Sequence, residues 1–288
     1  MKKRQKKGGV GPLLRTAINT LVANKVILFP YSIVLFVQLL ALEILYFIPQ
    51  FPLNTVFAPI IRKLWSEDYL HFPFNIALLP KLYQYAQIPI FLFISSYLIG
   101  VSVAVIAKIN SNKTVKMRSV FRETVGCYIH IVVAAAISFS MVVLLFKSYG
   151  LLTSRALMIR STAGIYFIIK KVILSGAPYI NLFFSVLVST LFAYVIPIII
   201  IDKRKVFAAL WVNFKILIKS FWLTLLMVLI PSLLFVPILL LRPIVFKNMI
   251  LPEMTILFMA ISAFVMIVID AVIYTAITTF YLSKKEGM

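Results

Sequence analysis

The sequence has few of the residues on which catalytic and metal sites depend. It contains one cysteine, two histidines and eight acidic residues among 288 positions. The single cysteine, Cys127, excludes a disulfide framework within the chain, and no Cys or His spacing matches a zinc site. Neither a GxSxG nucleophile elbow nor a GxxxxGK[ST] phosphate loop occurs. We therefore predict no catalytic residue, no cofactor and no metal, and expect a protein that is not an enzyme.

Hydrophobic residues dominate the composition. They make up 62% of the chain against 13% charged residues, and the mean hydropathy is +1.06, which excludes a water-soluble globular domain. Six apolar segments are long enough, or nearly so, to cross a hydrocarbon core that needs about 20 helical residues. These predicted spans are residues 26–48, 88–109, 127–146, 180–201, 221–241 and 254–282. The sequence predicts an all-α polytopic membrane protein.

Positive charge is distributed unevenly between the connections. On the predicted topology, 19 of the 29 Lys and Arg residues fall on one side, together with both termini. Because Lys and Arg resist translocation, we predict that this side is cytoplasmic. Residues 1–25 then form a cytoplasmic basic tail and a first helix, residues 26–282 the six-span domain, and residues 283–288 a cytoplasmic tail. Residues 151–174 leave two alternatives: an external interfacial helix, or an extra span that would change the topology.

The stretch "DKRKVFAALWVNFKILIKSFW", residues 202–222, joins basic sequence to apolar sequence without a break. On a helix, Arg204, Lys215 and Lys219 fall in one sector and aromatic residues such as Phe207 and Trp211 fall opposite. This pattern predicts an amphipathic helix in the membrane interface, with cations at the headgroups and aromatics toward the acyl chains. We call such a helix, which lies on the membrane before a span, an elbow helix.

Two further segments repeat the pattern, "RTAINTLVANK" before the first span and "RSVFRETVGCYIH" before the third. Aligning Arg15, Arg118 and Arg204 brings apolar positions into register. The alignment predicts three units of one elbow helix and two spans; the alternative is that any basic loop before a span looks similar. The elbow cations that we expect to contact anionic lipid are Arg15, Arg118, Arg122, Arg204, Lys205, Lys215 and Lys219.

The stretch "IIIIDKRKVFAALWVNFKILIKSFWLTLL" combines an acidic residue leaving the fourth span, a basic elbow and an aromatic entry to the fifth. In this it resembles six-span bacterial membrane proteins related to the membrane domain of glycerophosphodiester phosphodiesterases. The resemblance implies a multi-pass protein of the bacterial inner membrane. In the enzymes a soluble catalytic barrel follows the membrane domain. These 288 residues contain no such barrel, so the resemblance does not imply phosphodiesterase activity.

Ionisable residues within a span are costly and suggest function. Asp270 lies near the middle of the sixth span, with Tyr274 one turn later. One interpretation is a proton- or cation-coupled site, and the other is a hydrogen bond that holds spans together. Glu43 is the second such residue, near the outer end of the first span, where snorkelling to the interface is the favoured interpretation.

The net charge of +21 does not indicate nucleic-acid binding, because the charges border the spans rather than a basic soluble domain. Anionic lipid is the expected partner, beside a protein partner that the sequence does not identify. We predict a non-catalytic integral membrane protein that interacts with anionic lipids or organises a membrane partner. The alternative is a permease or accessory subunit of a transporter for a lipid-like or hydrophobic substrate.

Overall fold

A computed structural model describes residues 9–158, 164–247 and 252–286, and these residues form helices and no strand. Six of the helical segments are long and apolar enough to cross a membrane. The prediction of an all-α polytopic protein with six spans is confirmed. The basic residues before position 9, part of the predicted tail, lie outside the described residues.

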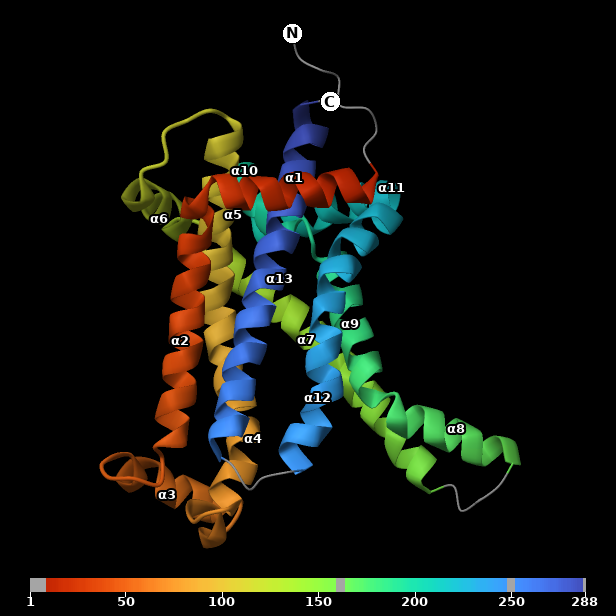
Figure 1. The fold of residues 1–288 in the computed structure, drawn as a ribbon. Coiled ribbons are helices and arrows are strands. Elements are labelled where there is room, and N and C mark those ends of the chain that lie inside the picture. Colours follow the sequence, from red (N-terminus) through yellow and green to blue (C-terminus); the bar gives the residue numbers. More distant parts are fainter. Residues whose placement is uncertain (1–8, 159–163, 248–251, 287–288) are drawn as a thin grey trace.

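The helices follow one another along the chain as Figure 1 shows. They are α1 (Val10–Ala23), α2 (Leu28–Tyr46), α3 (Leu53–Leu64), α4 (Phe74–Pro89), α5 (Ser96–Asn110), α6 (Met117–Val125), α7 (Tyr128–Leu157), α8 (Gly164–Ser175), α9 (Ala177–Leu191), α10 (Val195–Ile201), α11 (Val206–Ser232), α12 (Val236–Lys247) and α13 (Pro252–Glu286). The spans are α2, α4 with α5, α7, α9 with α10, the second part of α11 with α12, and α13.

The second span is longer than its apolar core. The helix runs from Phe74 to Asn110 as α4, a π-helical turn (Ile90–Ser95) and α5, about 55 Å at roughly 1.5 Å per residue. Hydropathy predicted its start at residue 88, because the preceding turns carry Lys81 and several Tyr and Gln residues. The π-helical turn follows Pro89, whose ring removes a backbone donor and widens the helix locally.

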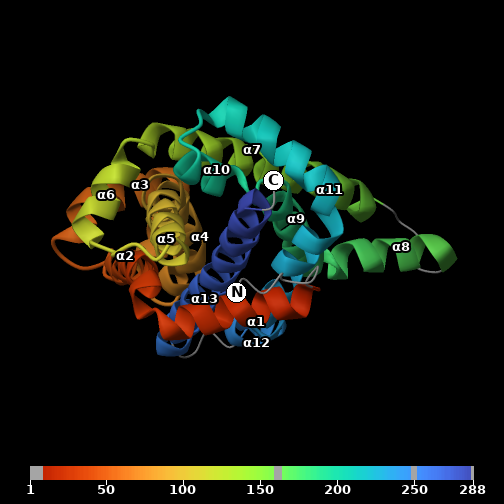
Figure 2. The same ribbon diagram turned by 90° about the horizontal axis from the view of Figure 1, so that it is seen from above.

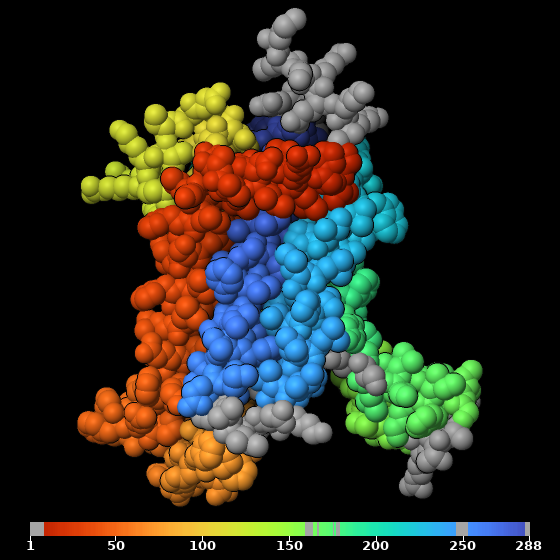
Figure 3. Space-filling view, viewed as in Figure 1, coloured from red at the N-terminus to blue at the C-terminus, as the bar shows by residue number. Residues whose placement is uncertain are grey.

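Elbow helices precede the first, third and fifth spans. α1 and α6 end at breaks near Asn24 and Gly126, and α11 changes direction at Ser220, whose φ of −136° and ψ of 21° are non-helical. Figure 3 shows α1 lying across the upper ends of the blue helices. The elbows and the C-terminal end of α13 lie at one end of the molecule (Figure 1), which we call the basic end.

Two sets of positions that the alignment makes equivalent share a burial class in all three elbows. The equivalent positions Ala17, Val120 and Val206 are all buried, and Val22, Val125 and Trp211 are all exposed. The third elbow differs in length, because its break at Ser220 comes about two turns after the position equivalent to Asn24. Lys215 and Lys219 lie on these two extra turns.

Each elbow packs on the last span of the preceding unit. α6 contacts α5, the first part of α11 contacts α10, and α1 contacts α13. The first span of a unit packs on the last span of its own unit and on that of the preceding unit. α2 packs on α5 and α13, and α7 packs on α9 and α5. Viewed from above, α1, α6 and α11 lie around α5 and α13 (Figure 2). Three equivalent units arranged in a ring would produce this pattern.

The described residues of the segment 151–174 do not include an extra span. α7 continues to Leu157, residues 159–163 lie outside the described residues, and α8 follows as a separate helix. Its 12 residues reach about 18 Å, too short for a hydrocarbon core of about 30 Å. α8 lies at the end opposite the basic end, as does α3 (Figure 1).

At the C-terminus, residues 283–286 continue α13 rather than form a tail.

Asn213 of the third elbow closes a break in the fourth span. The helix is interrupted between α9 and α10, and the buried Asn213 side chain donates to the Leu191 carbonyl at 2.7 Å and accepts from the Tyr194 N–H at 3.0 Å. The Thr224 hydroxyl donates to the Ser220 carbonyl, so the Tyr194 hydroxyl donates to Thr224 at 2.6 Å. These bonds satisfy backbone groups that hydrocarbon cannot solvate.

We predict that Asn213→Ala destabilises the protein by about 1–3 kcal/mol, because it leaves a buried N–H and a buried carbonyl unpaired. Thermal unfolding in detergent micelles measures the loss. Asn24→Ala is the matched control from the equivalent position of the first elbow, where the side chain bonds to Thr20 of its own helix. Equal losses from the two variants would contradict a specific role for Asn213.

Candidate anionic-lipid site at the basic end

The third elbow presents three distinct faces. Its buried face packs on α9 and α10 and includes Ala209, Asn213 and Leu217. A second face is apolar and exposed, and we call it the apolar stripe. It consists of Phe207, Trp211, Phe214, Ile218 and Trp222. The sequence placed Leu217 with this stripe, but Leu217 is 3% exposed because the adjacent spans cover that side. The third face carries the predicted cations. It borders the apolar stripe rather than lying opposite it as predicted, because Lys215 follows Trp211 by one helical turn and its Nζ lies 5.3 Å from the centroid of that ring.

A pocket of about 500 Å³ lies between the end of the third elbow and the end of α13. We call it the basic pocket; its volume falls within the range typical of ligand sites. The residues that line it are Asp202, Arg204, Val212, Lys215, Ile216, Ile218, Lys219, Tyr281, Lys284 and Lys285. Five of these residues are cationic and one is acidic, so the basic pocket favours an anion.

Asp202 holds the two walls of the basic pocket together. The Tyr281 hydroxyl donates to its Oδ2 at 2.7 Å, and Lys285 Nζ lies 2.6 Å from its Oδ1. Arg204 Nε lies 3.8 Å from the same carboxylate. The Asp202 side chain is 14% exposed, which strengthens these charge-assisted bonds relative to those of a surface pair. Asp202 thus matches the charge of one cation and fixes α13 to the start of the third elbow.

The positive charges of the other three lysines of the basic pocket, Lys215, Lys219 and Lys284, are less fully neutralised by acidic side chains. Lys215 and Lys284 lie over the rings of Trp211 and Phe280, at 5.3 and 5.6 Å from the ring centroids. The charge of Lys219 acts repulsively on Lys284 across the pocket. Within the described residues, no acidic side chain within 4.0 Å pairs with any of these three lysines. The arrangement concentrates positive charge at one point of the basic end.

The other predicted lipid contacts lie at the same end but outside the basic pocket. Arg15, Arg118, Arg122 and Lys205 are all exposed, on the three elbows or at their start. Next to them, Glu123 of α6 accepts from Lys108 of α5 at 2.7 Å and from Ser119 at 2.8 Å. These hydrogen bonds lower the pKa of the Glu123 carboxyl. The ion pair joins the second elbow to the preceding unit.

Asp270 belongs to a separate polar cluster inside the bundle. It is half-buried on the face of α13 that also carries the buried Ala263 and Ile267. Its charge acts on Tyr274, one turn along, and on Tyr31 of α2. The Tyr31 hydroxyl is buried without a hydrogen-bond partner, although Ser102 of α5 lies beside it. The sequence singled out Asp270 and Tyr274, and the tertiary structure adds Tyr31 and Ser102.

Glu43 is not part of this cluster. Its side chain is exposed in the last turn of α2, twelve residues from Tyr31 and therefore about 18 Å away along the helix. That position is near the end opposite the basic end, where a carboxylate reaches water or headgroups. The structure brings Asp270 together with Tyr274, but it does not bring either residue together with Glu43.

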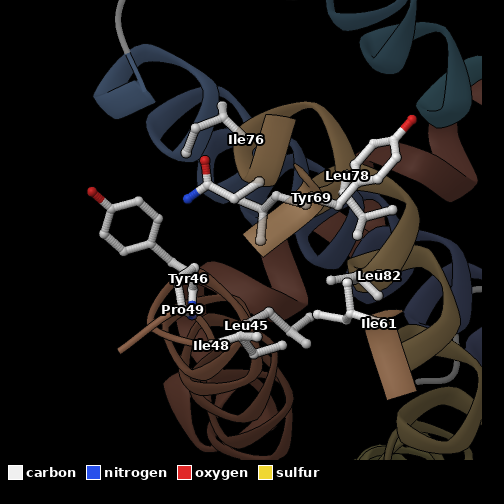
Figure 4. Close-up of a pocket in the computed structure, with 11 residues that line it drawn as sticks. Leu45, Tyr46, Ile48, Pro49, Ile61, Tyr69, Ile76, Leu78 and Leu82 are labelled. Carbon is white, nitrogen blue, oxygen red and sulfur yellow. The ribbon is translucent and has the colours of Figure 1, made fainter. Parts of the chain in front are cut away.

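A second cavity lies beneath α3 and α4, at the end opposite the basic end. Figure 4 shows it lined by apolar side chains, among them Ile48, Ile61 and Leu78. Its volume is about 10 Å³, which is room for at most about one water molecule. Asn75 also lines this cavity, and its buried side-chain Oδ1 has no hydrogen-bond partner among the described residues. The cavity is too small to be a ligand site.

The sequence analysis did not include four polar residues of the basic pocket among the site residues. They are Asp202, Tyr281, Lys284 and Lys285. Asp202 was noted only for its place in the resemblance, and the two lysines were assigned to the C-terminal tail. One feature of the sequence points to these residues: the last span and the third elbow both end in basic residues, which the predicted topology puts on the same side of the membrane. Their contact depends on a packing that hydropathy does not encode.

Comparisons of the chain with family models, with curated proteins and with solved structures find no match. The six spans nevertheless make this a multi-pass membrane protein.

We predict that Tyr281→Phe destabilises the protein by about 1.5–3 kcal/mol, because it removes a hydrogen bond to a largely buried carboxylate. Lys285→Gln should cost less than about 1 kcal/mol, since its side chain is 52% exposed and exposed ion pairs contribute little. Unfolding midpoints in detergent test both. If Lys285→Gln costs as much as Tyr281→Phe, the tyrosine is not the main attachment of α13 to Asp202.

Proposed function

We propose that this protein is a non-catalytic integral membrane protein that binds anionic lipids at its basic end and thereby organises lipid or a membrane partner. The observation that carries the proposal is the basic pocket, which combines five cations with one acid beside the exposed apolar stripe. Anionic headgroups would contact the cations, and acyl chains would contact the stripe.

The proposal includes the orientation of the protein. The excess of Lys and Arg at the basic end supports a cytoplasmic location for that end, where anionic lipids give the membrane a negative surface potential. The resemblance of the segment from Ile198 to Leu226 to membrane proteins related to glycerophosphodiester phosphodiesterases supports a bacterial inner membrane.

Lipid retention tests the proposed function. The purified protein is incubated with phosphatidylglycerol and phosphatidylcholine of identical acyl chains, and bound lipid is quantified by native mass spectrometry. We expect a preference for phosphatidylglycerol. Arg118→Gln with Arg122→Gln should weaken it by up to roughly fivefold per charge, which corresponds to about 1 kcal/mol per basic residue near a membrane. Both arginines are exposed on α6, so folding should be unaffected.

The control neutralises two exposed lysines at the other end of the molecule, Lys63 on α3 and Lys147 on α7. Lys63→Gln with Lys147→Gln removes the same charge, and we expect it to leave the preference unchanged. Equal binding of the two lipids by the unmodified protein would refute anionic-lipid recognition, and equal losses from both double variants would refute its location at the basic end.

Asp270 favours a second candidate function, a proton-linked permease for a lipid-like substrate. The carboxyl is close enough to Tyr274 of the same helix and to Tyr31 of α2 to interact electrostatically with both, and no Lys or Arg of the described residues forms an ion pair with it. An unpaired carboxylate inside a membrane is costly, so such a group takes up a proton or a cation. An intramembrane proton site below a lipid-binding pocket is the arrangement that a coupled lipid permease needs.

Asp270→Asn distinguishes this candidate. The variant should change the stability by less than about 1 kcal/mol, because the described residues give Asp270 no hydrogen bond or ion pair to lose, and it should abolish lipid movement driven by an imposed pH gradient. The assay follows a fluorescent phospholipid in proteoliposomes, with and without the gradient. Asp270→Glu should restore part of the driven movement. Gradient-driven movement that survives Asp270→Asn would exclude proton coupling through this residue.

A further inference from the structure

We propose that the basic pocket selects lipids whose headgroup carries more than one negative charge, such as a terminal phosphomonoester or a pyrophosphate. This inference rests on the proposed function and specifies its ligand. A phosphodiester headgroup such as phosphatidylglycerol carries one negative charge, whereas a phosphomonoester carries about −1.5 to −2 at neutral pH. The two classes can therefore be separated by charge at constant acyl chain.

The arrangement of charge in the pocket favours the more highly charged class. Asp202 is occupied by Tyr281, Lys285 and Arg204. Lys215, Lys219 and Lys284 then face the same space from two walls, the third elbow and α13. A single negative charge would neutralise one of these three ammonium groups and leave the others. A doubly charged phosphate offers three terminal oxygens that can accept from lysines on both walls at once.

Lys219 and Lys284 line the basic pocket from its two walls, Lys219 on the third elbow and Lys284 on α13. Two ammonium groups that repel across an open space define a position where an anion is stabilised by both. Binding a dianion there converts a repulsive contact into two attractive ones, and the gain grows with the charge of the ligand.

The surroundings of the pocket favour a lipid over free phosphate. Ile218 lines the pocket and is 82% exposed, and Trp222 one turn later is 74% exposed. Large apolar side chains with this exposure at a membrane interface lie against acyl chains. The headgroup space and the apolar stripe therefore meet at Ile218, as a molecule with a charged head and a hydrocarbon tail requires.

The site belongs to the third unit alone because of the length of its elbow. Lys215, Ile218 and Lys219 all lie on the two turns by which this elbow exceeds the first and second ones. The first and second elbows end before equivalent positions are reached. We accordingly assign general anionic-lipid contacts to all three elbows and headgroup selection to the third.

The test compares phosphatidic acid, a phosphomonoester, with phosphatidylglycerol of the same acyl chains, by competition in native mass spectrometry at neutral pH. We expect the unmodified protein to retain phosphatidic acid at least several-fold better. Lys219→Gln with Lys284→Gln should remove this preference and keep that for phosphatidylglycerol over phosphatidylcholine. Lys219→Arg with Lys284→Arg should keep both. Lys63→Gln with Lys147→Gln removes the same charge at the end opposite the basic end; this variant is the matched control and should keep both preferences.

Each result bears on a separate statement. Equal retention of phosphatidic acid and phosphatidylglycerol, both above phosphatidylcholine, would overturn headgroup selection and leave the proposed function intact. No preference for either anionic lipid would overturn both. Inorganic phosphate is added as a competitor at the concentration of the lipid, and we expect no displacement. Full displacement would overturn the assignment to a lipid by showing a site for soluble phosphate. Unfolding midpoints of all variants confirm that they are folded.

Discussion

The architecture depends on the packing of each elbow helix against the last span of the preceding unit. α6 lies on α5, the third elbow on α10, and α1 on α13, so the first unit is joined to the third although they are far apart in the sequence. Between helices in lipid there is little hydrophobic driving force, and association relies on close packing and on hydrogen bonds. Here the elbows contribute both, through buried residues such as Ala17 and Ala209 and through Asn213.

The third unit adds a pocket to this arrangement. Its elbow carries the bonds that close the break in the fourth span, and its two extra turns reach the end of α13. Asp202 then ties both walls together with a charge that Tyr281 and Lys285 match. The result is a cationic pocket beside an exposed apolar stripe.

The sequence analysis succeeded where one physical signal dominates. Runs of apolar residues located the six spans, since about 20 such residues are needed to cross a bilayer. The combination of cations and aromatics located the third elbow, and the alignment on Arg204 brought apolar positions of the three elbows into register. It was less accurate at helix ends. Hydropathy stops at the interface, whereas backbone hydrogen bonding continues the helix, which is why α4 begins at Phe74 and α13 continues to Glu286.

Composition and periodicity alone thus determined the membrane class, the number of spans and the positions of the elbows, because these depend on transfer of residues between water and lipid. The tertiary structure decided which side chains meet. Tyr31 lies 239 positions before Asp270 in the chain, and Asp202 lies 79 positions before Tyr281. No local sequence pattern predicts that the residues of either pair lie near each other. The candidate sites depend on such pairings, since a pocket forms only where helices from different units converge.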